Sequence, residues 1–210
     1  MSFTVSKPLV YLITEGQATP ANFTEKRREI LDIIRTAVEA GVSLVQLREK
    51  KLPARLLCQL TVEAAAITRG SATRLLVNDR ADIALAAKAD GVHLTANSLW
   101  SAVIRASFPK EFIIGVSTHT VDKALGASVN GADFVVFGPV FEALNKGEPK
   151  GLAKLRKVCE TLHPFPVLAL GGIDESNVLS VLEAGATGFA AIRALNDFDS
   201  LRSICKLING

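Results

Sequence analysis

Short apolar runs alternate with helix-length amphipathic segments from one end of this 210-residue chain to the other. Eight such runs predict strands, at residues 9–14, 44–48, 75–78, 91–94, 113–116, 134–138, 167–170 and 188–192. In the segments between them apolar residues recur three and four positions apart, as at Ile30, Ile33 and Ile34, which is typical of helices that bury one face. A helix-length crossover cannot form a hairpin, so the pattern predicts strands that pair in parallel.

Four of the predicted helices end in similar strings just before the next strand. The strings are Glu39-Ala40-Gly41-Val42, Lys88-Ala89-Asp90-Gly91, Val129-Asn130-Gly131-Ala132 and Glu183-Ala184-Gly185-Ala186. Each predicts a helix that ends on a glycine C-cap, where glycine adopts the left-handed conformation at little cost. No linker, low-complexity segment or change of composition interrupts the series. We therefore expect residues 1–210 to form one α/β domain, a single (β/α)8 TIM barrel, rather than an open doubly wound sheet.

The bulk composition excludes several classes of function. The 24 lysine and arginine residues and the 21 aspartate and glutamate residues are interspersed, so the net charge of +3 predicts no binding of nucleic acid. No apolar stretch reaches the roughly 18 residues of a membrane span, and residues 1–8 lack the apolar core of a signal peptide. Cys58, Cys159 and Cys205 are far apart and are expected to be core thiols. The sequence thus predicts a cytoplasmic protein and leaves a homo-oligomer open.

A phosphate site is predicted after the last two strands. The run at residues 167–170 stops at Gly171-Gly172-Ile173, and a helix-length segment separates it from the final run at residues 188–192. Without a Cβ at Gly171 and Gly172, the backbone can take a positive φ and bring its amides close to an anion. In a (β/α)8 barrel the loops after strands seven and eight are the usual phosphate site.

Cationic side chains follow the second predicted strand. Gln46 and Arg48 alternate with apolar residues, so both are expected to face the same side, and Lys50 follows. A guanidinium in the barrel mouth would suit a phosphate, with Lys50 adding a point charge. The alternative is an ion pair in the barrel core between Arg48 and either Glu49 or Asp79.

Other polar residues at strand ends have competing interpretations. Asp79 is a candidate ligand for magnesium, which proteins bind through one or two carboxylates plus phosphate oxygens, or it is an N-cap of the helix that begins near Ala81. His93 and His119 are expected to make ring hydrogen bonds inside the barrel, whereas His163 is predicted to lie in a surface turn. Trp100 is expected to pack with its own helix. The longest helix-free connection, residues 138–150, is a candidate lid.

Six strings along the chain resemble thiamine phosphate synthase in order and spacing. They are Gln46-Leu47-Arg48-Glu49-Lys50, Asn78-Asp79-Arg80, Ala89-Asp90-Gly91-Val92-His93-Leu94, Gly115-Val116-Ser117-Thr118-His119, Gly131-Ala132-Asp133-Phe134-Val135-Val136-Phe137-Gly138-Pro139-Val140-Phe141 and Gly171-Gly172-Ile173. The resemblance covers nearly the whole chain, and it extends to a superfamily that also contains a thiazole tautomerase.

The resemblance implies a barrel enzyme, a transferase of thiamine biosynthesis, that joins hydroxymethylpyrimidine diphosphate to thiazole phosphate with the help of Mg²⁺. Phosphorylated small molecules are the implied partners. The residues implied to hold the pyrimidine diphosphate are Gln46, Arg48, Lys50, Asn78, Ser117 and Lys146, of which Arg48, Lys50 and Lys146 would be catalytic. Asp79 would hold the metal. The thiazole phosphate would lie at Gly171, Gly172, Ile192 and Arg193.

The chain departs from the synthase pattern at chemically important positions. Ser98 stands where the family has a second metal-binding aspartate, the segment Glu142-Ala143-Leu144-Asn145-Lys146 keeps the lysine of the lid and loses its two threonines, and Arg193 replaces a serine. Three hypotheses follow: a synthase, a tautomerase-like isomerase, and a non-catalytic binder of phosphate or thiamine precursors. The isomerase would need a histidine where this chain has Pro139.

Overall fold

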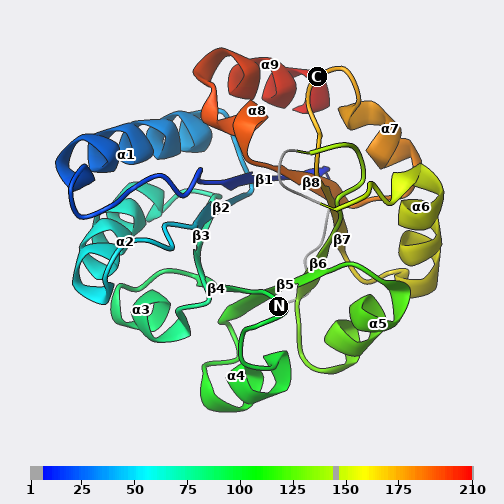
Figure 1. Cartoon of the computed structure of the whole chain (residues 1–210), viewed down its shortest axis with the longest axis horizontal. Coiled ribbons are helices and arrows are strands. Elements are labelled where there is room, and N and C mark those ends of the chain that lie inside the picture. Colours follow the sequence, from blue (N-terminus) through cyan, green and yellow to red (C-terminus); the bar gives the residue numbers. More distant parts are fainter. Residues whose placement is uncertain (1–6, 144–146, 210) are drawn as a thin grey trace.

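The computed structural model describes residues 7–143 and 147–209 of the chain. Eight parallel strands pair in sequence order and close into a barrel, with β1 beside both β2 and β8. Helices form a ring around it (Figure 1). The predicted (β/α)8 TIM barrel is therefore confirmed.

The observed strands match the predicted runs closely. They are β1 (Leu9–Ile13), β2 (Leu44–Leu47), β3 (Arg74–Asn78), β4 (Gly91–Leu94), β5 (Ile113–Thr118), β6 (Phe134–Phe137), β7 (Val167–Leu170) and β8 (Gly188–Ala191). The largest difference is at β5, which continues through Thr118 instead of ending at Val116.

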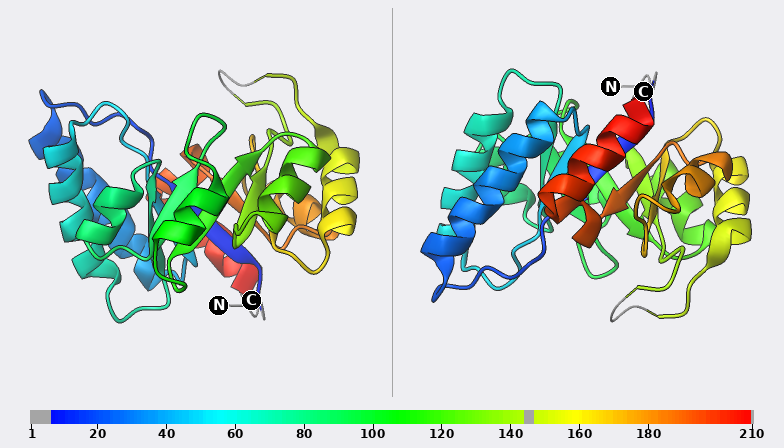
Figure 2. Two further views of the ribbon diagram at one scale, coloured as in Figure 1. Left: turned by 90° about the horizontal axis from the view of Figure 1, so that it is seen from below. Right: turned by 90° about the horizontal axis from the view of Figure 1, so that it is seen from above.

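The helices in the described residues alternate with these strands. They are α1 (Phe23–Glu39), α2 (Ala54–Thr68), α3 (Ala81–Ala86), α4 (Ser101–Ser107), α5 (Val121–Val129), α6 (Gly151–Leu162), α7 (Val178–Glu183), α8 (Arg193–Asn196) and α9 (Phe198–Asn209). The short helix α8 follows β8 at the barrel mouth. Helix α9 then packs beside α1 and completes the outer ring (Figures 1 and 2).

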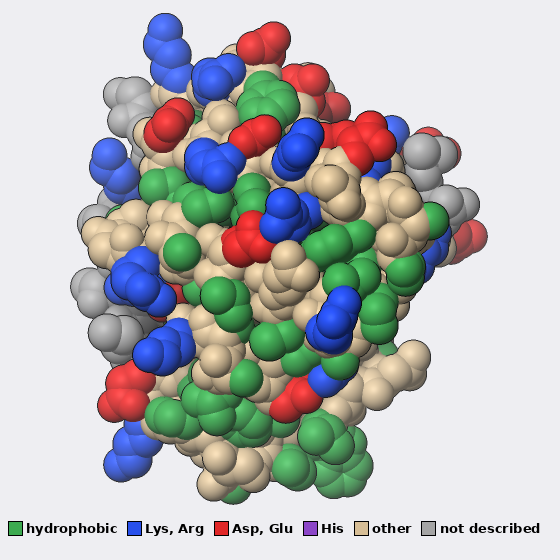
Figure 3. All heavy atoms as spheres, turned by 90° about the vertical axis from the view of Figure 1, so that its left-hand side faces the viewer, with side chains coloured by type: hydrophobic (Ala, Val, Ile, Leu, Met, Phe, Trp, Pro, Cys, Tyr) green, Lys and Arg blue, Asp and Glu red, His purple; other side chains and the backbone are tan. Residues whose placement is uncertain are grey.

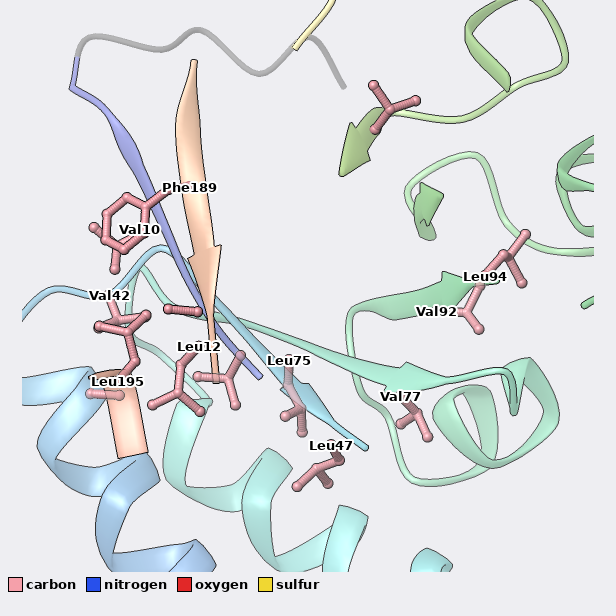
Figure 4. Close-up of a cluster of buried hydrophobic side chains, with 14 of the residues drawn as sticks. Val10, Leu12, Val42, Leu47, Leu75, Val77, Val92, Leu94, Phe189 and Leu195 are labelled. Atoms are coloured by element: carbon pink, nitrogen blue, oxygen red, sulfur yellow. The ribbon is translucent and has the colours of Figure 1, made fainter. Parts of the chain in front are cut away.

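Alternation along each strand divides the core into two layers. Val10 and Leu12 point outward and join a large apolar cluster between the sheet and the helices (Figure 4). Tyr11 and Ile13 point inward and help to fill the barrel interior with residues such as Phe134. Because each strand buries both faces, its sequence reads as a nearly continuous apolar run.

Four residues placed just before the even-numbered strands tie those strands to their odd-numbered neighbours. We call Ser43, Asp90, Asp133 and Thr187 the strand-bridging residues. The backbone N–H of each donates to the carbonyl of a residue on the neighbouring strand, Val10, Leu75, Ile114 and Val167 respectively. The side chain of each bridging residue accepts the N–H of that same neighbour, over 3.2, 2.8, 2.7 and 3.2 Å. The pairs β1–β2, β3–β4, β5–β6 and β7–β8 are thus all closed in the same way at the amino end of the barrel.

Three of the four predicted glycine C-caps are confirmed. Gly41, Gly131 and Gly185 have φ values of 75°, 87° and 93°. The fourth prediction was wrong, because Lys88 takes the left-handed conformation with φ 58° and Gly91 begins β4. A Cβ at Gly91 would lie 2.1 Å from the carbonyl oxygen of Ile113, so this glycine is needed for close contact between strands.

The surface and the cysteines largely follow expectation. Acidic and basic side chains are interspersed over the face formed by α1 and α2 (Figure 3). Among the described helices, none combines the length and apolar character required to cross a membrane.

Cys159 and Cys205 are buried and Cys58 is half-buried, and burial raises the pKa of Cys159 to about 11. The packing predicted for Trp100 was wrong, because its side chain is 80% exposed.

Candidate active site

The described residues proposed for the site gather where the carboxyl ends of the strands meet. Gln46 lies in β2, Asn78 ends β3, and Ser117 lies near the end of β5. Gly171 and Gly172 follow β7, and Ile192 and Arg193 follow β8. Arg48 and Lys50 come directly after β2, so they share this end of the barrel with the glycines. The predicted Lys146 lies outside the described residues.

Arg48 takes part in none of the ion pairs formed among residues 7–143 and 147–209. The predicted alternative, an ion pair with Glu49 or Asp79, was therefore wrong. The Glu49 carboxylate instead accepts hydrogen bonds from the Thr14 hydroxyl (2.7 Å) and from the backbone N–H groups of Gly16 (3.1 Å) and Ala18 (2.9 Å). These bonds fix the loop after β1 and leave the half-buried Arg48 guanidinium available to an anion.

Asp79 does not cap α3, so that prediction was also wrong. It adopts φ 59°, and the N-cap position belongs to Arg80, with no side-chain cap. The Asp79 carboxylate turns toward the loop after β4, where it accepts hydrogen bonds from the hydroxyls of Ser98 and Thr95. A left-handed backbone at a non-glycine residue is uncommon and here directs a carboxylate into the mouth.

Asn78 leaves an acceptor unused beside that carboxylate. Its amide nitrogen donates to Asp79 over 2.7 Å, which fixes the orientation of the amide. Its buried oxygen has no hydrogen-bond partner among the described residues. Since buried polar atoms are nearly always paired, this oxygen marks a place where a donor or a cation belongs.

The glycine bend after β7 has the predicted geometry. Gly171 and Gly172 have φ values of 104° and 64°. A Cβ on Gly172 would lie 2.4 Å from the carbonyl oxygen of Glu142, so glycine is also required for packing against the loop after β6. Both glycines line a cavity of about 640 Å³ together with Ile192 and Arg193. Arg193 is exposed and borders this cavity without filling it.

A second cavity, of about 360 Å³, lies between the ends of β4 and β5 and the helices that follow them. Ser117, Thr95 and Ser98 line it, together with the exposed Trp100. Because Thr95 and Ser98 also bond Asp79, this cavity opens beside the candidate metal ligand. His119 borders both cavities, so the two are neighbours at the mouth.

A buried chain of hydrogen bonds crosses the barrel just below the mouth. Gln46 Nε2 donates to the Tyr11 hydroxyl over 3.0 Å, that hydroxyl lies 3.2 Å from His93 Nδ1, and His93 Nε2 lies 2.8 Å from Ser117 Oγ. The sequence predicted a hydrogen-bonded His93 and missed Tyr11, although its alternation with Val10 and Leu12 marks it as inward-facing. Similarly, His119 Nδ1 lies 2.6 Å from the carbonyl oxygen of Gly138.

Burial is the largest influence on the pKa values of His93 and Tyr11 in this series of hydrogen bonds. It lowers the pKa of His93 to about 4, while Asp79 raises that pKa and Arg48 lowers it. Both charges at the mouth therefore act on the same ring. Burial also raises the pKa of the Tyr11 hydroxyl above its ordinary value, against the hydrogen bond from Gln46. Both side chains are neutral at pH 7.

Fold and site together define a class of protein. A closed (β/α)8 barrel whose mouth gathers a carboxylate, a glycine-lined cavity and a guanidinium with no ion pair among the described residues is typical of enzymes that act on phosphorylated small molecules.

Comparison with known proteins narrows this class to one family. The sequence profile of the family described as thiamine monophosphate synthase matches residues 10–195. The chain is 40% identical to a thiamine-phosphate synthase of Moorella thermoacetica, over 80% of this chain and 81% of that one. It is 36% identical to the thiamine-phosphate synthase of Roseiflexus castenholzii, over 92% and 83% of the two chains. The solved thiamine phosphate pyrophosphorylase of Pyrococcus furiosus superposes with a TM-score of 0.82 at 31% identity, covering 96% and 95% of the two chains. The chain belongs to the thiamine monophosphate synthase family.

Proposed function

We propose that this protein joins hydroxymethylpyrimidine diphosphate to thiazole phosphate, giving thiamine phosphate and pyrophosphate. The observation that carries the proposal is that Arg48, which forms no ion pair with the described residues, and the Asn78–Asp79 pair share one mouth with the glycine-lined cavity. Arg48, Asn78 and Asp79 suit a diphosphate, and the glycine-lined cavity suits a second phosphorylated molecule. The relatives described above carry the synthase name, and neither alternative hypothesis gains support from them.

The reaction breaks one bond and forms another at the same carbon. The C–O bond between the pyrimidine methylene and the diphosphate breaks, and its electron pair leaves with pyrophosphate. The lone pair of the thiazole nitrogen then forms the new C–N bond to that methylene. Negative charge therefore grows on the leaving group, where Arg48 and Lys50 are proposed to neutralise it. Binding both molecules in one mouth would also hold the nitrogen in line with the carbon.

The residues at the end of β3 fit Mg²⁺, provided that substrate oxygens and water complete its coordination. Asp79 offers a carboxylate, and the unpaired Asn78 oxygen and the Ser98 and Thr95 hydroxyls are further oxygen atoms around it. No group of three or more histidine, cysteine or acidic residues in the described chain could hold a metal, so Asp79 would be the central ligand. When bound, Mg²⁺ would neutralise charge on the departing diphosphate.

The thiazole phosphate is proposed to bind in the 640 Å³ cavity. The positive φ of Gly171 and Gly172 lets backbone amides approach an anion, and the exposed Arg193 borders the same space. A planar guanidinium can bind a phosphate through two hydrogen bonds, so Arg193 would provide more charge than the serine usual in the family.

The direct test mixes purified protein, both precursors and magnesium, and oxidises the product to fluorescent thiochrome. Asp79→Ala should lower product formation about 100-fold at a fixed magnesium concentration, because loss of a metal ligand or its support typically costs this much. Asp199→Ala is the matched control, because the Asp199 side chain is fully exposed, at 100%. If no product forms while thiazole phosphate alone releases heat in a calorimeter, the result would favour the isomerase or the non-catalytic binder over the synthase.

A further inference from the structure

The hydrogen-bond chain from Gln46 to Ser117 has a definite direction. Tyr11 is 0% exposed, and its hydroxyl already receives the amide hydrogen of Gln46. Its own single proton then points to its other partner, Nδ1 of His93. The neutral His93 ring therefore accepts at Nδ1 and carries its hydrogen at Nε2.

The same direction of hydrogen-bond donation continues from His93 to Ser117, at the edge of the cavity. Nε2–H of His93 donates to Ser117 Oγ over 2.8 Å. That bond occupies a lone pair of the Ser117 oxygen and leaves its hydroxyl hydrogen free to point elsewhere. Ser117 borders the 360 Å³ cavity with Thr95 and Ser98, the two residues whose hydroxyls bond Asp79. The free hydroxyl hydrogen thus has the candidate diphosphate site beside it.

Packing prevents the His93 ring from turning away from these partners. The Tyr11, His93 and Phe134 rings form a triangle with centroid separations of 5.7, 5.6 and 6.2 Å. Gly115 makes room for this cluster, because a Cβ there would lie 2.9 Å from His93 Nδ1 and 2.4 Å from Phe134 Cζ. His93 is 2% exposed, so water does not compete for its nitrogens.

We propose that Tyr11 and His93 are positioning residues that fix the Ser117 hydroxyl as a hydrogen-bond donor toward the pyrophosphate end of the substrate. The inference rests on the proposed function for the identity of this anion. A freely rotating hydroxyl could present either its hydrogen or its lone pairs to a negative charge, and lone pairs would repel it. A hydroxyl oriented before the substrate arrives needs no reorganisation when charge develops on the leaving group.

The first test measures the His93 tautomer in the protein without substrate. Long-range ¹H–¹⁵N NMR on histidine-labelled protein distinguishes a protonated Nε2 from a protonated Nδ1. We expect a protonated Nε2 in the wild type, and loss of this preference in Tyr11→Phe. A wild-type ring that carries its hydrogen on Nδ1 would reverse the chain and overturn the inference, whether or not the protein is a synthase.

The second test is a double-mutant cycle on the binding of inorganic pyrophosphate, measured by calorimetry at a fixed magnesium concentration. Ser117→Ala should weaken binding roughly tenfold, the usual effect of a hydrogen bond to a charged group. Tyr11→Phe should weaken pyrophosphate binding roughly threefold when Ser117 is present. In the Ser117→Ala background it should leave binding unchanged, because Tyr11 acts through the Ser117 hydroxyl. Equal effects of Tyr11→Phe in both backgrounds would show that it acts otherwise and would refute the proposal.

Two further variants separate positioning from general stability. His93→Gln supplies an amide N–H near the place of Nε2–H and should retain most of the pyrophosphate affinity, whereas His93→Leu should lose as much affinity as Ser117→Ala. Thr73→Val is the matched control, since it removes another buried hydroxyl, which donates to the Val42 carbonyl at the amino end of β3. It should leave affinity unchanged. Equal affinities of His93→Gln and His93→Leu would also refute the inference.

The same measurements distinguish a failure of this inference from a failure of the proposed function. If wild-type protein forms thiamine phosphate and binds pyrophosphate but the cycle shows no coupling, the positioning role alone is wrong. If the wild type neither binds pyrophosphate nor forms product, both proposals fall.

Discussion

Burial of His93 makes the free energy of unfolding depend on pH in the acid range. The pKa of its ring is about 4 in the folded protein, below its ordinary value of 6.5. Above pH 6.5 both the folded and the unfolded chain hold the ring neutral, so it adds no pH dependence. Between pH 6.5 and 4 the unfolded chain binds a proton that the folded chain excludes. The free energy of unfolding should therefore fall as the pH falls, by about 3 kcal/mol in total.

Urea unfolding at pH 7 and pH 4.5, followed by circular dichroism, measures this effect. His93→Gln has no titrating ring, so the part of the acid destabilisation that belongs to His93 should disappear. An unchanged difference in unfolding free energy between the two pH values in His93→Gln would contradict the assignment.

Gly172 can be tested against a glycine with similar backbone and open surroundings. Gly70 has φ 80° and nothing within 4 Å of the place where a Cβ would be, whereas a Cβ on Gly172 would meet the Glu142 carbonyl oxygen at 2.4 Å. Gly70→Ala should cost about 1 kcal/mol of unfolding free energy, from φ alone. Gly172→Ala should cost about 1 to 3 kcal/mol more, from overpacking, and should also weaken thiazole phosphate binding. Thermal unfolding and calorimetry check both effects, and equal destabilisation by the two variants would contradict them.

Sequence predicted individual residues well where the periodicity of a strand governs them. Gln46 was predicted to face away from Val45 and Leu47 because it alternates with them, and its side chain bonds the inward-facing Tyr11. Partners distant in sequence could not be predicted in this way: Tyr11 and His93 are 82 residues apart and meet only when the barrel closes. For Asp79, the N-cap prediction rested on the general preference of aspartate for that position. It was wrong because the backbone, with φ 59°, directs the carboxylate toward Ser98 and Thr95.

Among the strand-bridging residues, Asp133 makes the largest set of interactions. Besides bonding Ile114, its carboxylate pairs with Arg105 over 2.6 Å, and Arg105 also donates to the carbonyl oxygens of Gly131, Lys110 and Phe112. Asp133→Ala should lower the free energy of unfolding by about 2 kcal/mol, because it leaves a buried N–H without an acceptor. This corresponds to a fall in Tm of roughly 4 to 8 °C for a protein of this size.

Differential scanning calorimetry checks that prediction, with Asp133→Asn as the control. Asparagine keeps an oxygen for the Ile114 N–H and loses the charge, so its Tm should fall less. Because Asp133 lies at the amino end of β6, away from the mouth, thiamine phosphate formation per folded molecule should not change in either variant. A loss of activity at full folding would contradict this division of roles.

Secondary structure elements were predicted accurately because strand and helix periods differ strongly in this chain. The strand runs were correct to within two residues at each end. The error at Gly91 has a local cause. Its sequence neighbours resemble those of a C-cap, but glycine is required there because a Cβ would collide with the backbone of Ile113 in β5.

At the level of the whole molecule, substrate-like anions should stabilise the folded barrel. A ligand that binds the native state at about 100 times its Kd adds roughly 2.7 kcal/mol, which raises Tm by roughly 5 to 10 °C in a protein of this size. We expect this shift with magnesium pyrophosphate, measured by thermal unfolding, and a much smaller shift for Asp79→Ala. Equal shifts with and without magnesium would argue against a metal at Asp79.

The barrel itself was predictable because eight strand–helix alternations leave few other arrangements of one chain. The division of its mouth into two neighbouring cavities was not, since it depends on how the loop after β4 lies beside the end of β5 and how the loop after β6 bonds to the end of β7. Trp100 shows the same limit: its position beside Leu99 and Val103 suggested packing, and the tertiary structure leaves it exposed.

The strand-bridging residues occur at every second strand interface, so they divide the ring into four like quarters, and among the described residues the interfaces between quarters lack this two-way bridge. Each quarter is continuous in sequence, with its bridge spanning α1, α3, α5 or α7. A circular permutant opened near α2, α4 or α6 would keep each quarter uncut, whereas new ends placed in α3 or α5 would divide one. The positions at which this barrel tolerates being opened should therefore alternate around its circumference.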